Sequence, residues 1–403
     1  MRLRPVLAAV AAAAIASIAW AGTVAPAAGA APAAQPAKHV SRVCAQAAPG
    51  HAACNALRVD PAAAVAGSVT PAATTPSGIF PADIQSAYKL PGATAGAGRT
   101  VAIVDAFDDP TAAADLNTYR SQFGLPACTT ANGCFRKVNQ NGATSPPPAV
   151  DTGWAQEISL DVDMVSATCP NCHILLVEAN SSSFANLGAA VNRAATLGAT
   201  AISNSYGGAD SSDTTNGHFY NHPGIAVTAS SGDGGFGVEY PASSQFVVAV
   251  GGTSLRRATT TARGWTESAW SGAGSGCSRF NTAIPSASTF NTGCARRAVA
   301  DVSAVADPAT GVAVFDSTPA AGASGWLVFG GTSASSPIIA SVFGLAGNAA
   351  TIDANDFPYQ HSTSLFDVTT GSNGTCTPTQ LCRARAGWDG PTGLGTPNGT
   401  GGF

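Results

Sequence analysis

Short apolar runs alternate with stretches of helical periodicity along most of the chain. Five runs are rich in β-branched residues, as buried strands are: residues 100–104, 173–178, 200–205, 225–230 and 246–250. Three stretches between them have apolar residues at helical spacing: residues 110–123, 154–166 and 184–196. The alternation predicts an α/β fold, with a parallel sheet flanked by helices on both faces.

The last part of this pattern combines a strand, a turn and a helix. Residues 326–329 form another apolar run, a glycine-rich turn follows, and residues 333–345 have helical periodicity. We find no internal repeat at the periods of solenoid proteins. The sequence therefore predicts a single domain over residues 76–403.

The N-terminal part of the chain differs in composition from this domain. Arg2 and Arg4 precede an apolar run over residues 5–20, and small residues follow up to Ala30. This pattern is typical of a secretory signal peptide, with cleavage after Ala21 or after Ala30. A membrane anchor is the alternative, but the run is short for a span. We find no second apolar run of that length, and we expect a secreted, extracellular protein with no membrane partner after signal cleavage.

Residues 31–75 are rich in Ala, Pro, Gly and Thr, with little periodic apolar signal. We interpret them as a short leader or propeptide that follows a signal peptide over residues 1–30.

The whole chain has 403 residues, of which 45% are hydrophobic and 10% charged, so an ordered core is expected. Its formal net charge is −4 without a cluster of basic residues, which disfavours nucleic acid and anionic membranes as partners.

The ten cysteines fall into five couples of near neighbours in the sequence: Cys44 and Cys54, Cys128 and Cys134, Cys169 and Cys172, Cys277 and Cys294, Cys376 and Cys382. In an exported protein this even count indicates local disulfides, although sequence alone leaves the connectivity open. A redox or metal site at Cys169 and Cys172 is the alternative for that couple. A structural bridge is favoured because no partner motif of the same type accompanies it.

The first candidate for chemistry is a serine at a strand-to-helix turn. Ser333 lies in the stretch GGTSASSP, residues 330–337. Glycines before it let a substrate approach the backbone, and Pro337 is tolerated in the first turn of a helix. The turn would expose a hydroxyl together with backbone N–H groups, which acyl transfer requires. A plain N-cap serine is the alternative.

Three carboxylates accompany this serine in the sequence. Glu157 and Asp161 are four residues apart, so on a helix they share one face. Their apolar neighbours, such as Ile158 and Val162, argue against a simply solvated face, and a partly buried carboxyl pair titrates as a unit. Asp233 follows an apolar run in a glycine-rich loop, where an ordinary Asp-Gly turn is the alternative.

Together these motifs resemble those of the sedolisins, the serine-carboxyl peptidases, over about residues 76–398. The matching stretches occur in order: Trp154 with Glu157 and Asp161, SNSYG at 203–207, SGD at 231–233, YPA at 240–242, VGGT at 250–253, DVS at 301–303 with ADP at 306–308, and the Ser333 motif. The resemblance implies a subtilisin-like fold with Ser333 as nucleophile and Glu157 as general base. It further implies that Asp161 is the partner of Glu157 and that Asp233 is the carboxylic acid of the oxyanion hole.

The same resemblance implies one structural Ca²⁺ near the C-terminus. Asp367 and Val368, with Arg385, Gly387 and Asp389, are similar to the calcium loop of the family. Two carboxylates and three backbone carbonyls would give a shell of hard oxygen ligands. The sequence departs from the family at Arg385, where a glycine is usual, and in its leader, since sedolisins carry a large folded propeptide. An acidic glycine-rich loop without an ion is the alternative.

The sequence therefore predicts a monomeric, acid-active serine endopeptidase whose partners are protein or peptide substrates. A conventional subtilisin is one rival, but none of the six histidines lies in the sequence context that such an enzyme requires, and Asp233 stands where an Asn is expected. A catalytically inactive secreted binding protein on a peptidase scaffold is the other rival. All four catalytic positions are filled, which disfavours this second rival.

Overall fold

The computed structural model describes Met1, residues 39–60 and residues 74–403 of the chain. The signal peptide expected over residues 1–30 lies outside these residues, apart from Met1. Residues 39–60 are part of the expected leader, and they belong to the same compact unit as the rest of the described chain. Within residues 39–60 and 74–403, no helix is both long and apolar enough to cross a membrane.

An eight-stranded sheet forms the centre of this unit. Its main path runs in the order β12-β11-β9-β7-β4-β6-β5, and β15 also pairs with β11. All pairs are parallel except β11 with β12. The strands are β4 (Thr100–Ala106), β5 (Phe135–Asn139), β6 (His173–Ala179), β7 (Ala201–Asn204), β9 (Ala226–Ser230), β11 (Val248–Arg257), β12 (Trp265–Ala269) and β15 (Val302–Val305). The parallel sheet expected from the apolar runs is confirmed.

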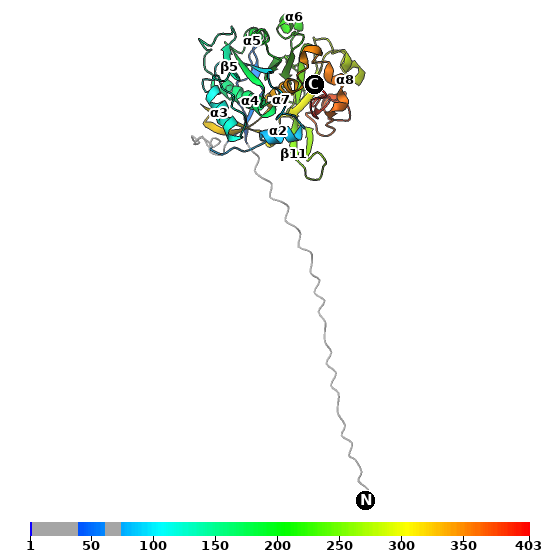
Figure 1. The fold of residues 1–403 in the computed structure, drawn as a ribbon. Coiled ribbons are helices and arrows are strands. Elements are labelled where there is room, and N and C mark those ends of the chain that lie inside the picture. Colours follow the sequence, from blue (N-terminus) through cyan, green and yellow to red (C-terminus); the bar gives the residue numbers. More distant parts are fainter. Residues whose placement is uncertain (2–38, 61–73) are drawn as a thin grey trace. The chain divides into compact units, whose positions relative to one another are not determined.

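Helices cover both faces of the sheet. On one face, α4 (Thr152–Thr168) and α7 (Thr332–Ala346) pack against each other, as Figure 1 shows. Both α2 (Pro81–Ala87) and α3 (Ala112–Gln122) pack against α4. On the other face, α5 (Phe184–Thr196) packs against β4 and β6. Two short helices, α6 (Asp213–Asn216) and α8 (Phe357–Gln360), lie in later connections.

Two smaller sheets involve the leader. The first is antiparallel in the order β1-β3-β17-β16, and the second has the order β10-β8-β2. Their strands are β1 (Val40–Arg42), β2 (Ala53–Cys54), β3 (Leu57–Val59), β8 (Tyr206–Ala209), β10 (Glu239–Tyr240), β16 (Val312–Ala320) and β17 (Ala323–Gly330). The strand expected at residues 326–329 is thus part of β17, outside the parallel sheet. Two further strand pairs are β13 (Gly276–Cys277) with β14 (Ala298–Val299) and β18 (Leu365–Phe366) with β19 (Thr396–Pro397).

Disulfides and a buried ion pair fix the connections between these elements. The ten cysteines are joined within the five sequence couples, so the expectation of local disulfides is confirmed. Arg297 and Asp301 are both fully buried, with 2.5 Å between guanidinium and carboxylate. The Tyr359 hydroxyl donates a further bond to Asp301 at 2.6 Å. A buried ion pair with its hydrogen bonds satisfied is costly to break, so these groups hold the segment before β15 in place.

Candidate active site

The candidate nucleophile lies in the first turn of α7. The helix begins at Thr332, directly after β17, and Gly331 makes the turn with φ 93°, a conformation that favours glycine. Ser333 is buried, and its hydroxyl donates to the backbone carbonyl of Ser205 at 3.0 Å. Ser333 therefore lies at the positive end of a 15-residue helix, as the sequence predicts.

The position of Pro337 differs from the sequence expectation. It is the sixth residue of α7 rather than part of the first turn. Because proline has no N–H, the carbonyl of Ser333 receives no helical hydrogen bond from residue 337. The Ser205 hydroxyl donates to this carbonyl at 3.3 Å instead. Ser205 thus contacts Ser333 through both its hydroxyl and its carbonyl, which ties the start of α7 to the sheet.

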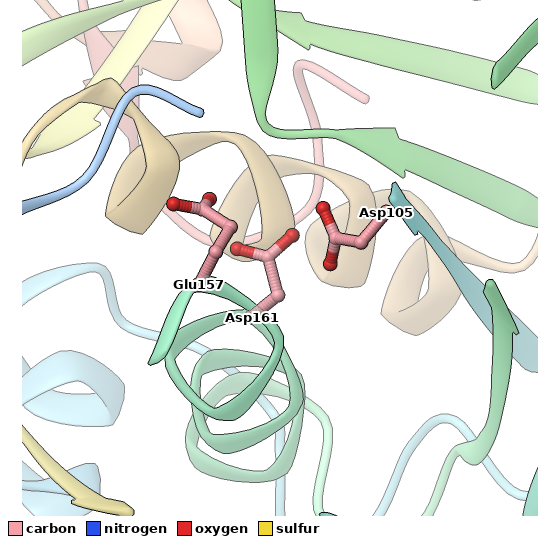
Figure 2. A group of neighbouring side chains, drawn as sticks. All are labelled: Asp105, Glu157 and Asp161. Carbon is pink, nitrogen blue, oxygen red and sulfur yellow. The ribbon is translucent and has the colours of Figure 1, made fainter. Parts of the chain in front are cut away.

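Glu157 and Asp161 rise from one side of α4, and the Asp161 carboxyl lies between that of Glu157 and a third carboxyl, that of Asp105 (Figure 2). The helix begins where the Asp151 carboxylate accepts bonds from the Gly153 and Trp154 N–H groups at 3.0 Å. Carboxylate oxygens from Asp105, Glu157 and Asp161 lie within 4.8 Å of one another. All three side chains are fully buried, so the expectation that this face of α4 is not solvated is confirmed.

Asp105 is the residue that our sequence reasoning missed. It lies near the C-terminal end of β4, directly after the apolar run at residues 100–104. The ends of parallel strands are where ligand-binding residues gather in α/β proteins. That position was the available signal, whereas its proximity to α4 is a tertiary contact that sequence spacing does not reveal.

Burial raises the pKa of each carboxyl in this cluster. The pKa of Asp105 rises to about 8. The pKa values of Glu157 and Asp161 are well above their usual range because of burial first and neighbouring carboxyls second. The nearby Ser333 side chain acts in the opposite direction on Glu157. Three carboxyls this close cannot all be ionised, so they share protons and titrate as a unit.

Asp233 faces the start of α7 from the loop after β9. Its Oδ1 accepts bonds from the Thr332 N–H at 2.8 Å and from the Thr332 hydroxyl at 2.9 Å. Its Oδ2 is buried and has no hydrogen-bond partner among the side-chain and backbone groups described. Burial raises the pKa of Asp233 to about 7, and the charge of Glu239 contributes to this rise. A neutral carboxyl with a free oxygen is what an oxyanion-hole acid requires.

The structure therefore brings all four predicted catalytic residues to one place. Ser333 on α7 lies near Glu157 on α4, with its hydroxyl bonded to Ser205 and with both Glu157 oxygens free of a hydrogen-bond partner among the described residues. Asp161 and Asp105 belong to the same carboxyl cluster as Glu157. Asp233 bonds to Thr332, the residue directly before Ser333. The histidines lie elsewhere: His39, His51, His173 and His218 are exposed, and the partly buried His222 and His361 bond to backbone carbonyls of neighbouring turns. His173 begins β6 but is not buried, contrary to its place in an apolar run.

The candidate calcium loop has the donor types that Ca²⁺ prefers. Burial raises the pKa of Asp389 to about 7, and the nearby Asp367 carboxylate adds to this effect. Backbone N–H groups bond to both: Gly387 to Asp367 at 2.8 Å and Arg385 to Asp389 at 3.1 Å. Across the part of the chain that the structure describes, neither carboxylate forms an ion pair. Two neighbouring carboxylates without a protein cation fit a bound divalent ion.

Comparison with known proteins places the chain in a peptidase family. The family model described as the subtilase family matches residues 139–360, more than half of the chain, and the protein belongs to this family. The chain is similar to Kumamolisin from Bacillus sp. (strain MN-32), with 28% identity over 364 residues. That alignment covers 80% of this chain and 63% of the relative, so the chain spans less than two thirds of the relative's length.

Solved structures with the same fold include Pseudomonas sedolisin, a serine-carboxyl proteinase complexed with pseudo-iodotyrostatin. It matches with a TM-score of 0.66 and 24% identity, over 80% of this chain and 96% of its own. A psychrophilic protease named S41 matches with a TM-score of 0.52 and 16% identity, over 81% of this chain and 99% of its own. The resemblance to sedolisins and the subtilisin-like fold expected from the sequence are thereby confirmed.

Proposed function

We propose that the protein is a secreted, acid-active serine endopeptidase that hydrolyses peptide bonds in proteins or peptides. One observation supports this most directly: the hydroxyl at the start of α7 lies beside a buried cluster of carboxyls. The Ser333 side chain lies near enough to Glu157 to oppose the rise in the pKa of that carboxyl. Both carboxylate oxygens of Glu157 are buried without a hydrogen-bond partner in the part of the chain that the structure describes, so one of them is free to accept the serine proton. Because no histidine lies in this cluster, a carboxylate is the available base.

In this mechanism Ser333 Oγ attacks the carbonyl carbon of the scissile bond and Glu157 accepts its proton. Asp161 shares a proton with Glu157 and holds that side chain in position, as neighbouring carboxyls on one helix face can. Asp105 extends the cluster behind Asp161 and acts as a positioning residue. Glu157 then returns the proton to the departing amine, as a general base does in acyl transfer.

Two donors are available for the oxyanion that forms during the attack. One is the backbone N–H of Ser333 at the N-terminus of α7, which the helix dipole favours. The other is Asp233 in its neutral form. Because Oδ1 already accepts two bonds from Thr332, the proton belongs on Oδ2, which is free to donate. This requirement for a neutral Asp233 suits operation at acid pH.

The rest of the chain fits the same proposal. We propose a signal peptide over residues 1–30, a leader over residues 31–75 and a monomeric peptidase domain over residues 76–403. Five disulfides suit an extracellular location. One structural Ca²⁺ would be held by Asp367 and Asp389, with the carbonyls of Val368, Arg385 and Gly387 completing the oxygen shell.

Substitution of the nucleophile tests the proposal. Ser333→Ala should remove proteolysis of a denatured protein at acid pH, with kcat falling by on the order of 10⁶ as in comparable nucleophile removals. Folding should be retained, because only a hydroxyl is removed. The measurement is a pH series of digestion with mass spectrometry of the products, after preincubation of each enzyme at acid pH. Circular dichroism checks the fold, and a folded variant with substantial turnover would exclude Ser333 as nucleophile.

A further inference from the structure

Residues 52–59 of the leader run through the site on both sides of Ser333. On one side, β2 pairs antiparallel with β8, so that Ala53 lies opposite Gly207 and Cys54 opposite Tyr206. On the other side, β3 pairs antiparallel with β17, which leads directly into α7, and Leu57 lies opposite Gly330. Both pairings extend an existing sheet with an extra strand, a common way in which an extended peptide is bound.

Between these two pairings, the backbone of Asn55 is fixed at the nucleophile. Its N–H donates to the carbonyl of Ser205 at 3.1 Å, and its carbonyl oxygen accepts the Ser333 N–H at 3.0 Å. A Cβ built on Gly331 would come within 2.1 Å of this oxygen and within 2.5 Å of Asp233 Oδ2. The Asn55 carbonyl therefore lies beside both groups that our mechanism uses as oxyanion donors.

The side chain of Asn55 fills a polar pocket of its own. Its Nδ2 donates to Ser230 Oγ at 2.9 Å and to Glu239 Oε2 at 3.2 Å, and the residue is 2% exposed. The Glu239 side chain packs closely on two glycines, since a Cβ at Gly207 would lie 2.0 Å from it and one at Gly232 2.8 Å. These contacts leave the Glu239 carboxyl facing a short side chain that carries an amide.

We infer that the leader is the first substrate of the enzyme, that Asn55–Ala56 is the bond presented to Ser333, and that Ser230 and Glu239 select asparagine at the residue before the cleaved bond. This inference rests on the proposed peptidase function, and it adds the substrate class and the processing site. Glu239 supports the inferred specificity, because burial raises its pKa to about 7. At acid pH its carboxyl is therefore neutral and can accept a hydrogen bond from the neutral amide of asparagine.

A disulfide-closed hairpin holds this bond in place. β1 pairs with β3, the Val43 N–H donates to the Ala56 carbonyl at 3.3 Å, and Cys44 is bridged to Cys54 next to Asn55. Both cysteines lie on the N-terminal side of the bond. Cleavage therefore separates a disulfide-linked fragment that ends at Asn55 from a chain that begins at Ala56. Until then the leader covers the nucleophile and excludes other substrates.

The step is an ordinary acyl transfer followed by hydrolysis. Ser333 Oγ forms an ester with the Asn55 carbonyl carbon while the bond to the Ala56 nitrogen breaks. The proton of the serine passes through Glu157 to that nitrogen, which leaves as an amine. Water then hydrolyses the ester, which gives a carboxylate at Asn55 and restores the Ser333 hydroxyl.

Mapping of the chain termini tests the processing site. The full chain is purified as wild type and as Ser333→Ala, and both are incubated at acid pH and analysed by intact mass and peptide mapping. We expect a new terminus at Ala56 in the wild type and an uncut bond in Ser333→Ala. Asn55→Leu should slow this cleavage roughly tenfold or more, because the pocket loses its hydrogen-bond partner. Gln46→Ala, an exposed change in the same hairpin, should process at the wild-type rate.

The outcomes separate the inference from the proposed function. If the wild type digests a denatured protein while the Asn55–Ala56 bond stays intact, the inference is wrong and the peptidase function stands. If neither the wild type nor Ser333→Ala digests anything, the proposed function itself is wrong. Cleavage at residue 55 in Ser333→Ala would assign the cut to another protease and would also overturn the inference.

Matched peptides test the pocket on the processed enzyme. The reference peptide has the sequence of residues 52–59 with Ser in place of Cys54, and its relatives carry Asp or Leu in place of Asn55. We expect kcat/KM to favour the Asn peptide over the Leu peptide by roughly tenfold or more. Glu239→Ala should reduce this ratio toward one, and Glu239→Gln, which still offers an oxygen acceptor, should retain most of it. Equal rates on the Asn and Leu peptides with wild type would overturn the assigned specificity.

Discussion

The two oxygens of Asp233 have different surroundings, and the difference determines where its proton lies. Oδ1 accepts two bonds from Thr332, whereas Oδ2 is buried without a partner and lies near the Asn55 carbonyl oxygen. Burial raises the pKa of this carboxyl to about 7. Below that pH the group is neutral and can donate, and above it the charge opposes an oxyanion.

Substitution of Asp233 should therefore change both the rate and its pH dependence. Asp233→Ala removes one oxyanion donor and should lower kcat by about 10²–10³. Asp233→Asn keeps a donor at every pH, so its activity should extend to higher pH than that of the wild type, although its maximum rate can be lower. The measurement is kcat against pH from 3 to 9 on a peptide substrate.

The contrast between the two variants is the control. Both remove the same ionisable group, but only the amide can donate a hydrogen bond. If Asp233→Ala is as active as the wild type across the acid range, the loop after β9 is an ordinary turn. If Asp233→Asn loses activity over the same alkaline range as the wild type, another group sets that limit.

At the residue scale, the sequence identifies what is local and misses what depends on tertiary contacts. Ser333 is recognisable because glycines and a helix pattern surround it, and Glu157 and Asp161 are recognisable because their spacing places them on one helix face. Asp105 belongs to another element and meets them only when β4 packs beside α4. Glu239 likewise becomes part of a pocket only through contacts with β8 and the leader.

At the element scale, long periodic segments are predicted and short irregular strands are not. The helix expected at residues 184–196 matches α5 in full, and that expected at 154–166 lies within α4. β1, β2 and β3 have two or three residues each, too few for a periodic signal. β2 and β3 form because β8 and β17 each offer an edge for pairing, and β1 in turn pairs with β3. These reasons lie outside the sequences of the three strands themselves. This is why the sequence alone predicts only a leader over residues 31–75.

The calcium loop allows a test at the same scale. If Asp367 and Asp389 hold the ion, excess chelator should lower the melting temperature, because Ca²⁺ binds the native state only. An ion present at 100 times its Kd would contribute about 2.7 kcal/mol to the free energy of unfolding. The measurement is a thermal melt of Ser333→Ala, which prevents self-digestion, with Ca²⁺ and with chelator.

Asp367→Asn in the same background is the matched control for this experiment. It removes one charged ligand while keeping the size of the side chain, so its melting temperature should respond little to either addition. If the parent Ser333→Ala melts at the same temperature with Ca²⁺ and with excess chelator after prolonged dialysis, the loop holds no stabilising ion. A response to Ca²⁺ that is equally large in Asp367→Asn would place the ion elsewhere.

At the scale of the whole molecule, the chain buries several carboxyls with raised pKa values. Burial raises the pKa of Asp105 and Asp316 to about 8 and that of Asp233 to about 7. These groups lie in the active site and also beyond it, since Asp316 is part of a separate acidic group with Asp109 and Asp115. In the unfolded chain the same carboxyls titrate near 4.

The sign of the resulting pH dependence follows from proton binding. Between about pH 4 and pH 8 the native protein holds more protons on these carboxyls than the unfolded chain does. The free energy of unfolding must therefore fall as pH rises through this window, by about 1.4 kcal/mol per pH unit for each group that stays protonated only in the native state. The protein should be more stable at pH 4.5 than at pH 8, the opposite of a protein stabilised by ionised, salt-bridged carboxylates.

Urea denaturation of Ser333→Ala at several pH values, with chelator present, measures this slope. Adding Asp105→Asn removes one buried titrating group, so the slope should become shallower by up to about 1.4 kcal/mol per pH unit and the protein should gain stability near pH 8.

Asp151→Asn is the control, because Asp151 is an exposed N-cap of α4 and asparagine caps a helix equally well. It should leave the slope unchanged. If the parent is equally stable at pH 4.5 and pH 8, the buried carboxyls do not stay protonated in the native state, and the proton-sharing carboxyl cluster on which the mechanism depends is excluded.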